Sequence, residues 1–491
     1  MKKFLINFTI IISSISGVFI CILSEKSVAD GYQLLWIHPL TFLIVFILIF
    51  SNLIRYKKFK ITVYFTVLLS WIRCVLIPIV SSLSGLYNGI PYMENYTKSI
   101  ELAIWLVPYE LIISSFFLWI MVVSNKVTLR PKDELKLKGD KYIYLIFIVT
   151  ALSLYLLIGR NLNIIKLFFV STEETGVFSD IVSTPMLLLR YIIKSGMIFF
   201  FVWSVSYCKN KYESKGKKRY VYYAIIVGII NVGIIIGGRR SEQLYTCLVV
   251  IFILTRAFKK YRKRIITYIV ITAISVAFVM TIYKQFSAAY YGSYSAALNA
   301  NNVDLEFIAK NLQSYFFGTQ NLAVTIELKK ATDLNIINML YDFGRSIFGI
   351  SFLLKNKMMM TTEYFNTFIY GVSRANGHVL SGIGYGYIYF GTLFSPIIVC
   401  LNMFISIKLE KYFNKTNSYE MTYIVGYILI RFATNIYVNT PPLISLSTIM
   451  LFTAGLIYFV AKLFKNNYNR IMLTTRGECS KHIKTSGGLN K

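Results

Sequence analysis

The sequence predicts an all-α polytopic membrane protein with about 12 transmembrane helices and a large, partly helical extracytoplasmic loop late in the chain. Of the 491 residues, 56% are hydrophobic and only 15% are charged, whereas soluble domains carry about 25% charged residues. The apolar residues form runs of about 20, the length at which a helix crosses a bilayer with its backbone polar groups paired internally. Lys and Arg gather in short clusters between these runs, as they do in the loops of membrane proteins.

Twelve apolar runs are long enough to be predicted as spans. They cover 4–23, 34–54, 61–83, 100–123, 142–159, 184–207, 221–237, 241–257, 265–283, 383–405, 419–438 and 442–462. Their orientation follows from the basic residues, which are abundant in segments such as 124–141 and 255–264 and scarce in the short segments that alternate with these. Because cytoplasmic loops carry the excess of Lys and Arg, both termini are predicted to be cytoplasmic.

The predicted spans divide the chain into four regions. An N-terminal bundle of nine spans covers 1–283, the large extracytoplasmic loop covers 284–382, three further spans cover 383–462, and a basic cytoplasmic tail covers 463–491. Apolar residues recur in the loop at helical spacing, which predicts amphipathic helices on the outer membrane surface. These residues are Leu334, Ile337, Leu340, Ile347 and Phe348.

Charge and cysteine usage exclude several classes of function. The net charge is +30, but the basic residues are divided among short loops rather than gathered on one domain, which argues against a nucleic-acid partner. The six cysteines form no CxxC pair, and the chain has only three histidines. Neither a disulfide framework nor a metal centre is expected, and no cofactor is predicted.

Cations at the outer ends of spans are the first candidate functional residues. A cation near hydrocarbon costs about 2.5–3.5 kcal/mol at mid-membrane, so it persists when it is paired or when it binds an anion. Guanidinium groups suit phosphate because their planar fork donates paired hydrogen bonds. We therefore expect these side chains to bind a lipid-linked diphosphate. They are Arg160, Arg190, Lys194, Arg239, Arg240 and Arg431.

The alternative for these cations is structural. They would then reach the lipid headgroups or pair with glutamates, for which Glu101 and Glu110 are the main candidates. Arg73, in the middle of the third predicted span and close to Pro78, is expected to pair with Glu110 rather than to act in catalysis.

A second group of candidates lies in the large loop, where Arg345, Arg374 and His378 are predicted to be catalytic. Histidine titrates near neutral pH, so His378 is a candidate base for a sugar hydroxyl. Asp304 and Glu306 are alternative bases, although acidic residues at the start of a helix commonly stabilise its macrodipole.

Two short motifs give the chain a family resemblance. Gly237–Arg240 resembles the glycine–arginine turn at the outer end of a span in the Wzy-type polymerases of capsule and O-antigen repeat units. Ser381–Gly391 is similar to the segment after that family's large loop, and its glycines also predict close helix packing. The arginine–glycine spacing of some family members is missing after Arg345 and Arg374, which leaves the roles of those two residues open.

The resemblance implies a membrane glycosyltransferase of the bacterial cytoplasmic (inner) membrane. Such an enzyme polymerises undecaprenyl-diphosphate-linked oligosaccharide repeat units at the outer face, transferring the growing glycan as a block to a new lipid-linked unit. It needs neither metal nor cofactor, and its partners would be membrane lipids, a chain-length regulator and a flippase. The alternatives are a lipid-linked oligosaccharide flippase and a ligase-type glycan transferase.

Overall fold

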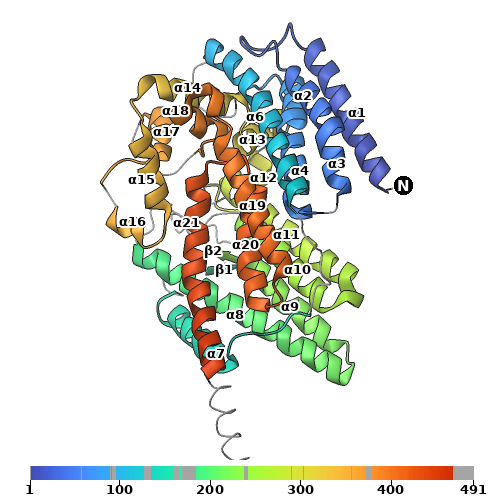
Figure 1. Ribbon diagram of the computed structural model, residues 1–491, viewed down its shortest axis with the longest axis vertical. Helices are drawn as coiled ribbons and strands as arrows, with labels where there is room; N and C mark the ends of the chain where they lie inside the picture. The colour runs from blue at the N-terminus through green and yellow to red at the C-terminus, as the bar shows by residue number, and fades with distance from the viewer. Residues whose placement is uncertain are drawn as a thin grey trace, which may run out of the picture. The chain divides into compact units, whose positions relative to one another are not determined.

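The computed structural model describes residues 2–467, except for 57, 89, 91–95, 126–133, 160–164, 169–183, 237–240, 289, 302, 355–356 and 372–377. Helices make up nearly all of the described structure (Figure 1). They are α1 (Lys2–Leu23), α2 (Ile37–Val45), α3 (Ser51–Arg55), α4 (Lys60–Trp71), α5 (Ile77–Ser84), α6 (Thr97–Ser124), α7 (Lys141–Leu154), α8 (Thr184–Lys215), α9 (Arg219–Gly233), α10 (Ser241–Ala257), α11 (Arg262–Gln285), α12 (Tyr294–Ala300), α13 (Leu305–Phe316), α14 (Thr319–Ala331), α15 (Ile336–Ser346), α16 (Ile350–Leu353), α17 (Thr361–Tyr370), α18 (Gly382–Phe394), α19 (Ile397–Lys415), α20 (Tyr419–Thr434) and α21 (Thr440–Met450).

Short irregular turns join some of these helices into longer rods. π-Helical turns at Phe46–Phe50 and Ile72–Leu76 continue α2 into α3 and α4 into α5, and two more follow α7 and α21. The strands β1 (Ile165–Leu167) and β2 (Ile234–Ile236) pair antiparallel.

Eight helices or helix runs in the described residues are long and apolar enough to cross a membrane. They coincide with eight of the predicted spans and confirm an all-helical membrane protein. They cover Leu5–Leu23, Ile37–Arg55, Lys60–Ser84, Thr97–Ser124, Lys141–Ile158, Leu188–Lys215, Lys259–Tyr283 and Thr440–Asn467.

The other four predicted spans are shorter or bent, so the count of about 12 is not confirmed. Helices α9, α10 and α20 have 15, 17 and 16 residues. Helix α9 ends early because its last predicted residues form β2 instead.

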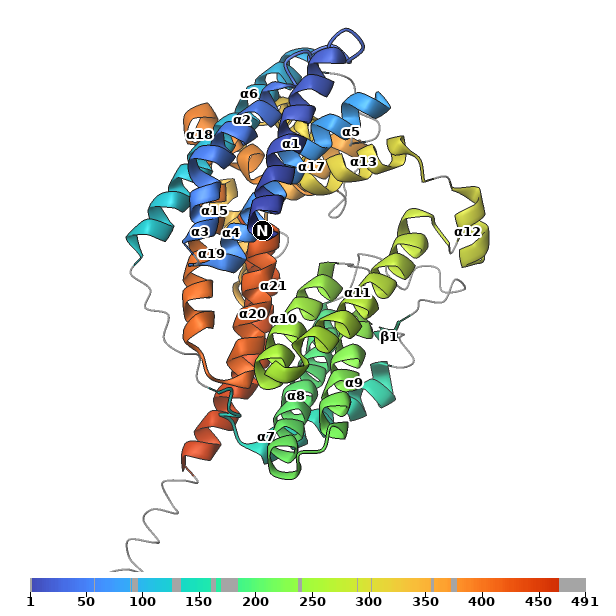
Figure 2. The same cartoon turned by 90° about the vertical axis from the view of Figure 1, so that its right-hand side faces the viewer.

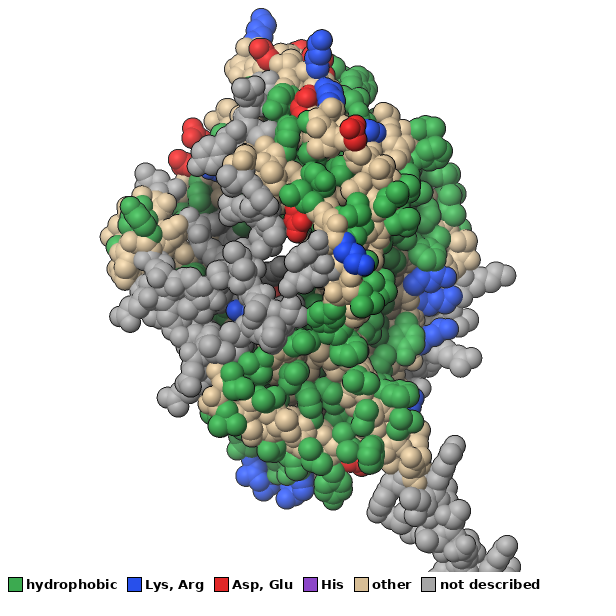
Figure 3. Space-filling view, turned by 90° about the vertical axis from the view of Figure 1, so that its left-hand side faces the viewer, with side chains coloured by type: hydrophobic (Ala, Val, Ile, Leu, Met, Phe, Trp, Pro, Cys, Tyr) green, Lys and Arg blue, Asp and Glu red, His purple; other side chains and the backbone are tan. Residues whose placement is uncertain are grey.

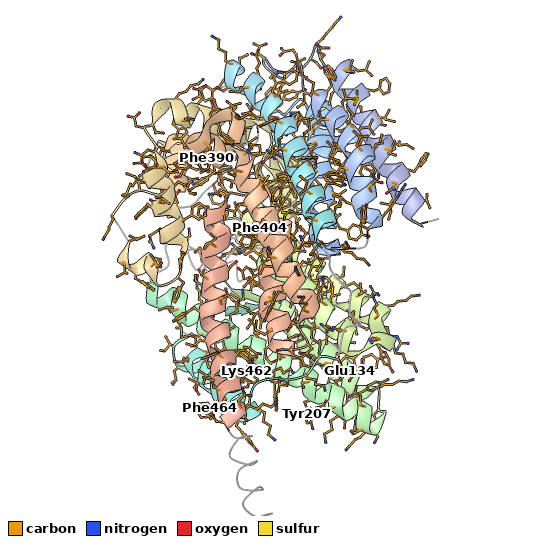
Figure 4. All side chains as sticks on the ribbon, viewed as in Figure 1. Glu134, Tyr207, Phe390, Phe404, Lys462 and Phe464 are labelled. Carbon is orange, nitrogen blue, oxygen red and sulfur yellow. The ribbon has the colours of Figure 1, made fainter. Side chains whose placement is uncertain are left out.

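The predicted span 383–405 is not one straight helix, because α18 and α19 meet at an angle of 111°. Two residues explain the bend: Gly391 has a φ of 71°, outside the helical region, and Pro396 lacks the N–H of a helix interior. Figure 4 labels Phe390 on α18 and Phe404 on α19, one on each side of this bend.

The segment 284–382 is largely helical, as predicted, but its helices differ in burial. Helices α13 and α15 each have one polar and one apolar side. Helix α14 is instead buried on nearly every side and packs against α6 and α18. The expectation of surface helices throughout this segment is therefore wrong for α14, because most of its residues are buried by protein.

The chain forms two compact units, each made of segments that are distant in the sequence. The first unit comprises 1–131, 298–415 and 428–448, and in it α6 packs against α2, α14 and α19. The second unit comprises 132–297, 416–427 and 449–491, and in it α8, α9, α10 and α11 lie side by side (Figure 2). The four predicted regions follow membrane topology, whereas these units follow packing.

Large apolar side chains cover much of the surface, as the face in Figure 3 shows. Leu23 on α1 is 82% exposed, and Phe278 on α11 is 58% exposed. Water would make this surface costly at about 25 cal/mol per Å² of apolar area, whereas lipid tails do not. The exposed apolar faces of the candidate spans therefore suit a bilayer.

Candidate functional site

A buried cluster of charged and polar groups lies in the second unit, where α8, α10 and α20 meet. The ammonium group of Lys194 forms an ion pair with Glu242 and donates a hydrogen bond to the hydroxyl of Tyr427 at 3.0 Å. The Tyr427 hydroxyl in turn donates to Oε2 of Glu242 at 2.6 Å. We call these three residues the Lys194 cluster.

The position of each group in its helix explains the cluster. Glu242 lies in the first turn of α10, where the helix dipole favours a carboxylate. The Lys194 ammonium lies 4.7 Å from the centre of the Tyr427 ring, a cation–π distance. Lys194 itself lies in a candidate span, where an unpaired cation would be costly, and its ion pair with Glu242 offsets part of that cost.

Arg190 precedes Lys194 by one turn of α8, so the two side chains share a helix face, as predicted. The Nε atom of Arg190 is buried and has no hydrogen-bond partner among the described residues. A buried donor without a partner is costly and suits an acceptor such as a phosphate oxygen.

Sequence reasoning missed two members of the cluster. Glu242 falls in the predicted eighth span, and the sequence gives Glu101 and Glu110 as the main candidate partners for the cations instead. Its position two residues after Arg240, at the start of a helix, is the signal that could have identified it. Tyr427 carries no such signal, because it is one of 37 tyrosines.

Four of the predicted site residues, Arg160, Arg239, Arg240 and Arg374, lie outside the described residues. Gly237–Arg240 directly precedes Ser241, the first residue of α10. In the sequence, the two arginines of this motif therefore stand next to the helix that supplies Glu242.

Two predicted arginines of the first unit bind backbone carbonyl groups. Nη2 of Arg431 donates to the carbonyl of Pro442 at 3.0 Å, and Arg431 is buried. Nη1 of Arg345 donates to the carbonyl of Ser351 at 2.9 Å, close to the end of α15. Each contact occupies one N–H group of a guanidinium, so the predicted roles of these two arginines stay predictions.

His378 lies just before α18 and is partly buried. Its ring stacks on Tyr370 with 6.1 Å between the ring centres. Asn366 binds its backbone through both the N–H and the carbonyl, at 2.8 and 3.1 Å. The alternative base Asp304 accepts a hydrogen bond from the backbone N–H of Phe307 and caps α13, as the helix-start explanation predicts.

The predicted pair of Arg73 and Glu110 is confirmed. Arg73 forms an ion pair with Glu110, and its Nε donates to the carbonyl of Phe317 at 3.0 Å. Arg73 lies in the π-helical turn Ile72–Leu76. This turn comes just before Pro78, which has no backbone N–H to donate to the carbonyl one turn earlier.

Arg73 also lines a narrow cavity of the first unit, which has room for about one water-sized molecule. The buried His38 lines the same cavity and contacts the carbonyl of Ile104 through Nε2 at 3.0 Å. The cavity is too small in this state for a sugar or a diphosphate.

A second carboxyl group that sequence reasoning missed is Asp342 on α15. It accepts hydrogen bonds from the hydroxyl of Tyr385 at 2.9 Å and from the backbone N–H of Thr361 at 3.1 Å. Burial raises the pKa of Asp342 above its usual value, because the charged form loses its hydration. Asp342, Asn338 and Ser346 recur every four residues, and this polar stripe was the available signal.

Within the described residues, no three His, Cys, Asp or Glu side chains lie close enough together to bind a metal ion. Comparison with known proteins adds no relative: no family model, no curated protein and no solved structure matches the chain.

Proposed function

We propose that the chain is a membrane glycosyltransferase that polymerises lipid-diphosphate-linked oligosaccharide repeat units at the outer face of the bacterial cytoplasmic membrane. The proposal combines the resemblance of the two sequence motifs with the Lys194 cluster. The observation that carries it is a paired cation within a candidate span, next to an arginine whose Nε has no described partner.

Such a transfer needs a base for the acceptor hydroxyl and cations for the leaving diphosphate. A hydroxyl of the acceptor unit attacks the anomeric carbon of the donor glycan, and the bond from that carbon to the lipid diphosphate breaks. The hydroxyl proton passes to a base, and the diphosphate leaves with the electron pair of the broken bond. Fixed cations stabilise the charge that develops on the leaving group.

The residues divide between these roles. Arg190, Arg239 and Arg240 are the candidates for contacting the diphosphate, and of these Arg190 lies within the described residues. Lys194 is a positioning residue in this scheme, because its charge is already balanced by Glu242. Glu242 joins His378 as a candidate base, since a carboxylate between an ammonium and a tyrosine hydroxyl is held in one orientation.

Replacing the cations of this site tests the proposal in a strain whose own gene is deleted. We expect Arg190→Gln and Arg239→Gln each to reduce long-chain polysaccharide by more than tenfold, because each removes a hydrogen-bond donor for the diphosphate. The measurements are the chain-length ladder on a gel and the amount of protein in the membrane.

Lys209→Gln is the matched control. Lys209 is also a buried lysine of α8, and it forms ion pairs with Glu134 and Glu213 at 3.4 and 3.3 Å. The substitution removes both ion pairs from the same helix without touching the proposed site, so the ladder should stay normal. An unchanged ladder in both arginine variants would contradict the diphosphate site.

A lipid-linked oligosaccharide flippase is the second candidate, and the bend between α18 and α19 favours it. Transporters commonly place substrate sites at helices that break within the membrane. Analysis of the deletion strain separates the two functions. A polymerase defect leaves single repeat units attached at the cell surface, whereas a flippase defect leaves lipid-linked units on the inner leaflet.

A further inference from the structure

Helix α15 is polar on its buried side and apolar on its exposed side. Asn338, Asp342 and Ser346, which are four residues apart, are 8%, 1% and 4% exposed. Ile337 and Leu340 on the other side are 60% and 63% exposed. This is the reverse of a helix at a water-exposed surface, where the apolar side faces the core.

The short helix α16 continues the exposed apolar surface. Ile350 and Leu353 on α16 are 42% and 73% exposed. The hydroxyl of Tyr341 on α15 donates to the carbonyl of Leu354 at 2.7 Å, which fixes α16 against α15 (left side of Figure 1). We call Ile336, Ile337, Leu340, Ile350 and Leu353 the α15–α16 face.

A second, independent observation concerns the depth of this face. The hydroxyl of Thr448 accepts from the backbone N–H of Phe348 at 3.1 Å and lies 3.3 Å from the carbonyl oxygen of Ser346. These two contacts attach the end of α15 to a residue inside the candidate span Thr440–Asn467.

The length of the span gives the depth of Thr448 for a span centred in the bilayer. The span has 28 residues and is therefore about 42 Å long, against a hydrocarbon thickness of about 30 Å. Thr448 lies eight residues, or about 12 Å, from the start of the span. If the span is centred in the bilayer, about 6 Å of it projects at each end, and Thr448 lies about 6 Å inside the hydrocarbon.

We infer that α15 and α16 enter the bilayer from its outer side and that lipid acyl chains cover the α15–α16 face. Part of the segment predicted as an extracytoplasmic loop is then a re-entrant element. The polar side of α15 remains dry by packing on protein, since Tyr385 and Thr361 satisfy Asp342. This inference does not depend on the proposed glycosyltransferase activity.

Acyl chains account for the face better than a second copy of the protein does. The attachment to Thr448 places the face at a depth where lipid surrounds any membrane protein. A homodimer would be needed to explain an apolar face only if that face stood in water.

Tryptophan fluorescence in vesicles tests the inference. We expect Leu340→Trp, reconstituted into phosphatidylcholine brominated in the middle of its acyl chains, to show strongly quenched fluorescence after subtraction of the wild-type signal. The subtraction removes the contribution of the five native tryptophans. Leu353→Trp is the second variant in case Leu340→Trp fails to fold.

Two control positions calibrate the quenching. Ile274→Trp on α11 marks a lipid-facing position, since Ile274 is 63% exposed within a candidate span. Lys310→Trp marks an exposed position on the polar side of α13. Quenching at 340 or 353 close to that at 274 supports the inference. Quenching no stronger than at 310 overturns the inference. Weak quenching at 340 together with cross-linking between two copies through residue 340 also overturns it.

Discussion

At the scale of single residues, ion pairs between side chains distinguish the charges within candidate spans that are structural. Arg73 and Glu110 are buried together, and neither can be exchanged alone without leaving a charge uncompensated. Lys194 and Glu242 form a similar pair with a small residual exposure of 11% for each side chain. The second pair is therefore the more accessible of the two to a substrate.

Breaking the Arg73–Glu110 pair should be much more costly than removing it. We expect Arg73→Met to destabilise the protein by about 3–5 kcal/mol, because Glu110 is left buried and unpaired. The double variant Arg73→Met with Glu110→Gln should recover much of this loss. Thermal unfolding midpoints in detergent measure both effects. The exposed pair Lys330–Glu327 is the control, since Lys330→Ala should cost less than about 1 kcal/mol.

Asp342 should give the protein a distinct pH dependence. Its pKa is raised in the folded state, so its contribution to stability is full below the unfolded pKa and is lost as the pH rises through the folded value. The unfolding midpoint of the wild type, relative to Asp342→Asn, should therefore increase as the pH falls from neutral. A difference between the two proteins that does not change with pH would contradict the shift.

At the scale of elements, the glycine-rich start of α18 is explained by close packing. A Cβ on Gly386 would lie 2.0 Å from the carbonyl oxygen of Ser395, where the chain folds back at the bend. A Cβ on Gly382 would lie 2.7 Å from Val399 of α19. The predicted packing role is confirmed for Gly382 and Gly386, although the neighbour of Gly386 is the chain's own bend rather than a separate helix. It is wrong for Gly391, which has nothing within 4 Å of its Cβ position and instead adopts a positive φ at the bend.

Gly386→Ala should disrupt this bend, because the added methyl group has no space and the atom it meets belongs to the backbone. We expect a loss of folded protein in the membrane, or an unfolding midpoint lowered by several degrees. Gly455→Ala is the matched control, since nothing lies within 4 Å of its Cβ position. A midpoint equal to that of the control would show that α18 packs differently.

At the scale of the whole molecule, the short helices α9 and α10 decide how many times the chain crosses the membrane. With 15 and 17 residues they are about 22 and 26 Å long, somewhat shorter than a hydrocarbon core of about 30 Å. The side of the membrane on which residues 237–240 lie distinguishes a hairpin that spans the bilayer from one that stays on the cytoplasmic side.

An epitope tag inserted after Gly238 should be accessible from outside intact cells if α9 and α10 cross the membrane, as the basic residues on either side of the pair predict. A tag at the C-terminus should become accessible only after permeabilisation, because both termini are predicted to be cytoplasmic. Labelling of the Gly238 tag only in permeabilised cells would reduce the number of spans by two.

The sequence by itself determined the fold class, eight of the candidate spans and the pairing of Arg73 with Glu110. These depend on local composition, helix length and the cost of an isolated charge in hydrocarbon, which can be read residue by residue. Only the tertiary structure decided that Lys194 pairs with Glu242, that α14 is buried and that α15 turns its apolar side outward. Each of these depends on which distant segments pack together, and helical periodicity shows that a helix has two sides without showing which side meets protein and which meets lipid.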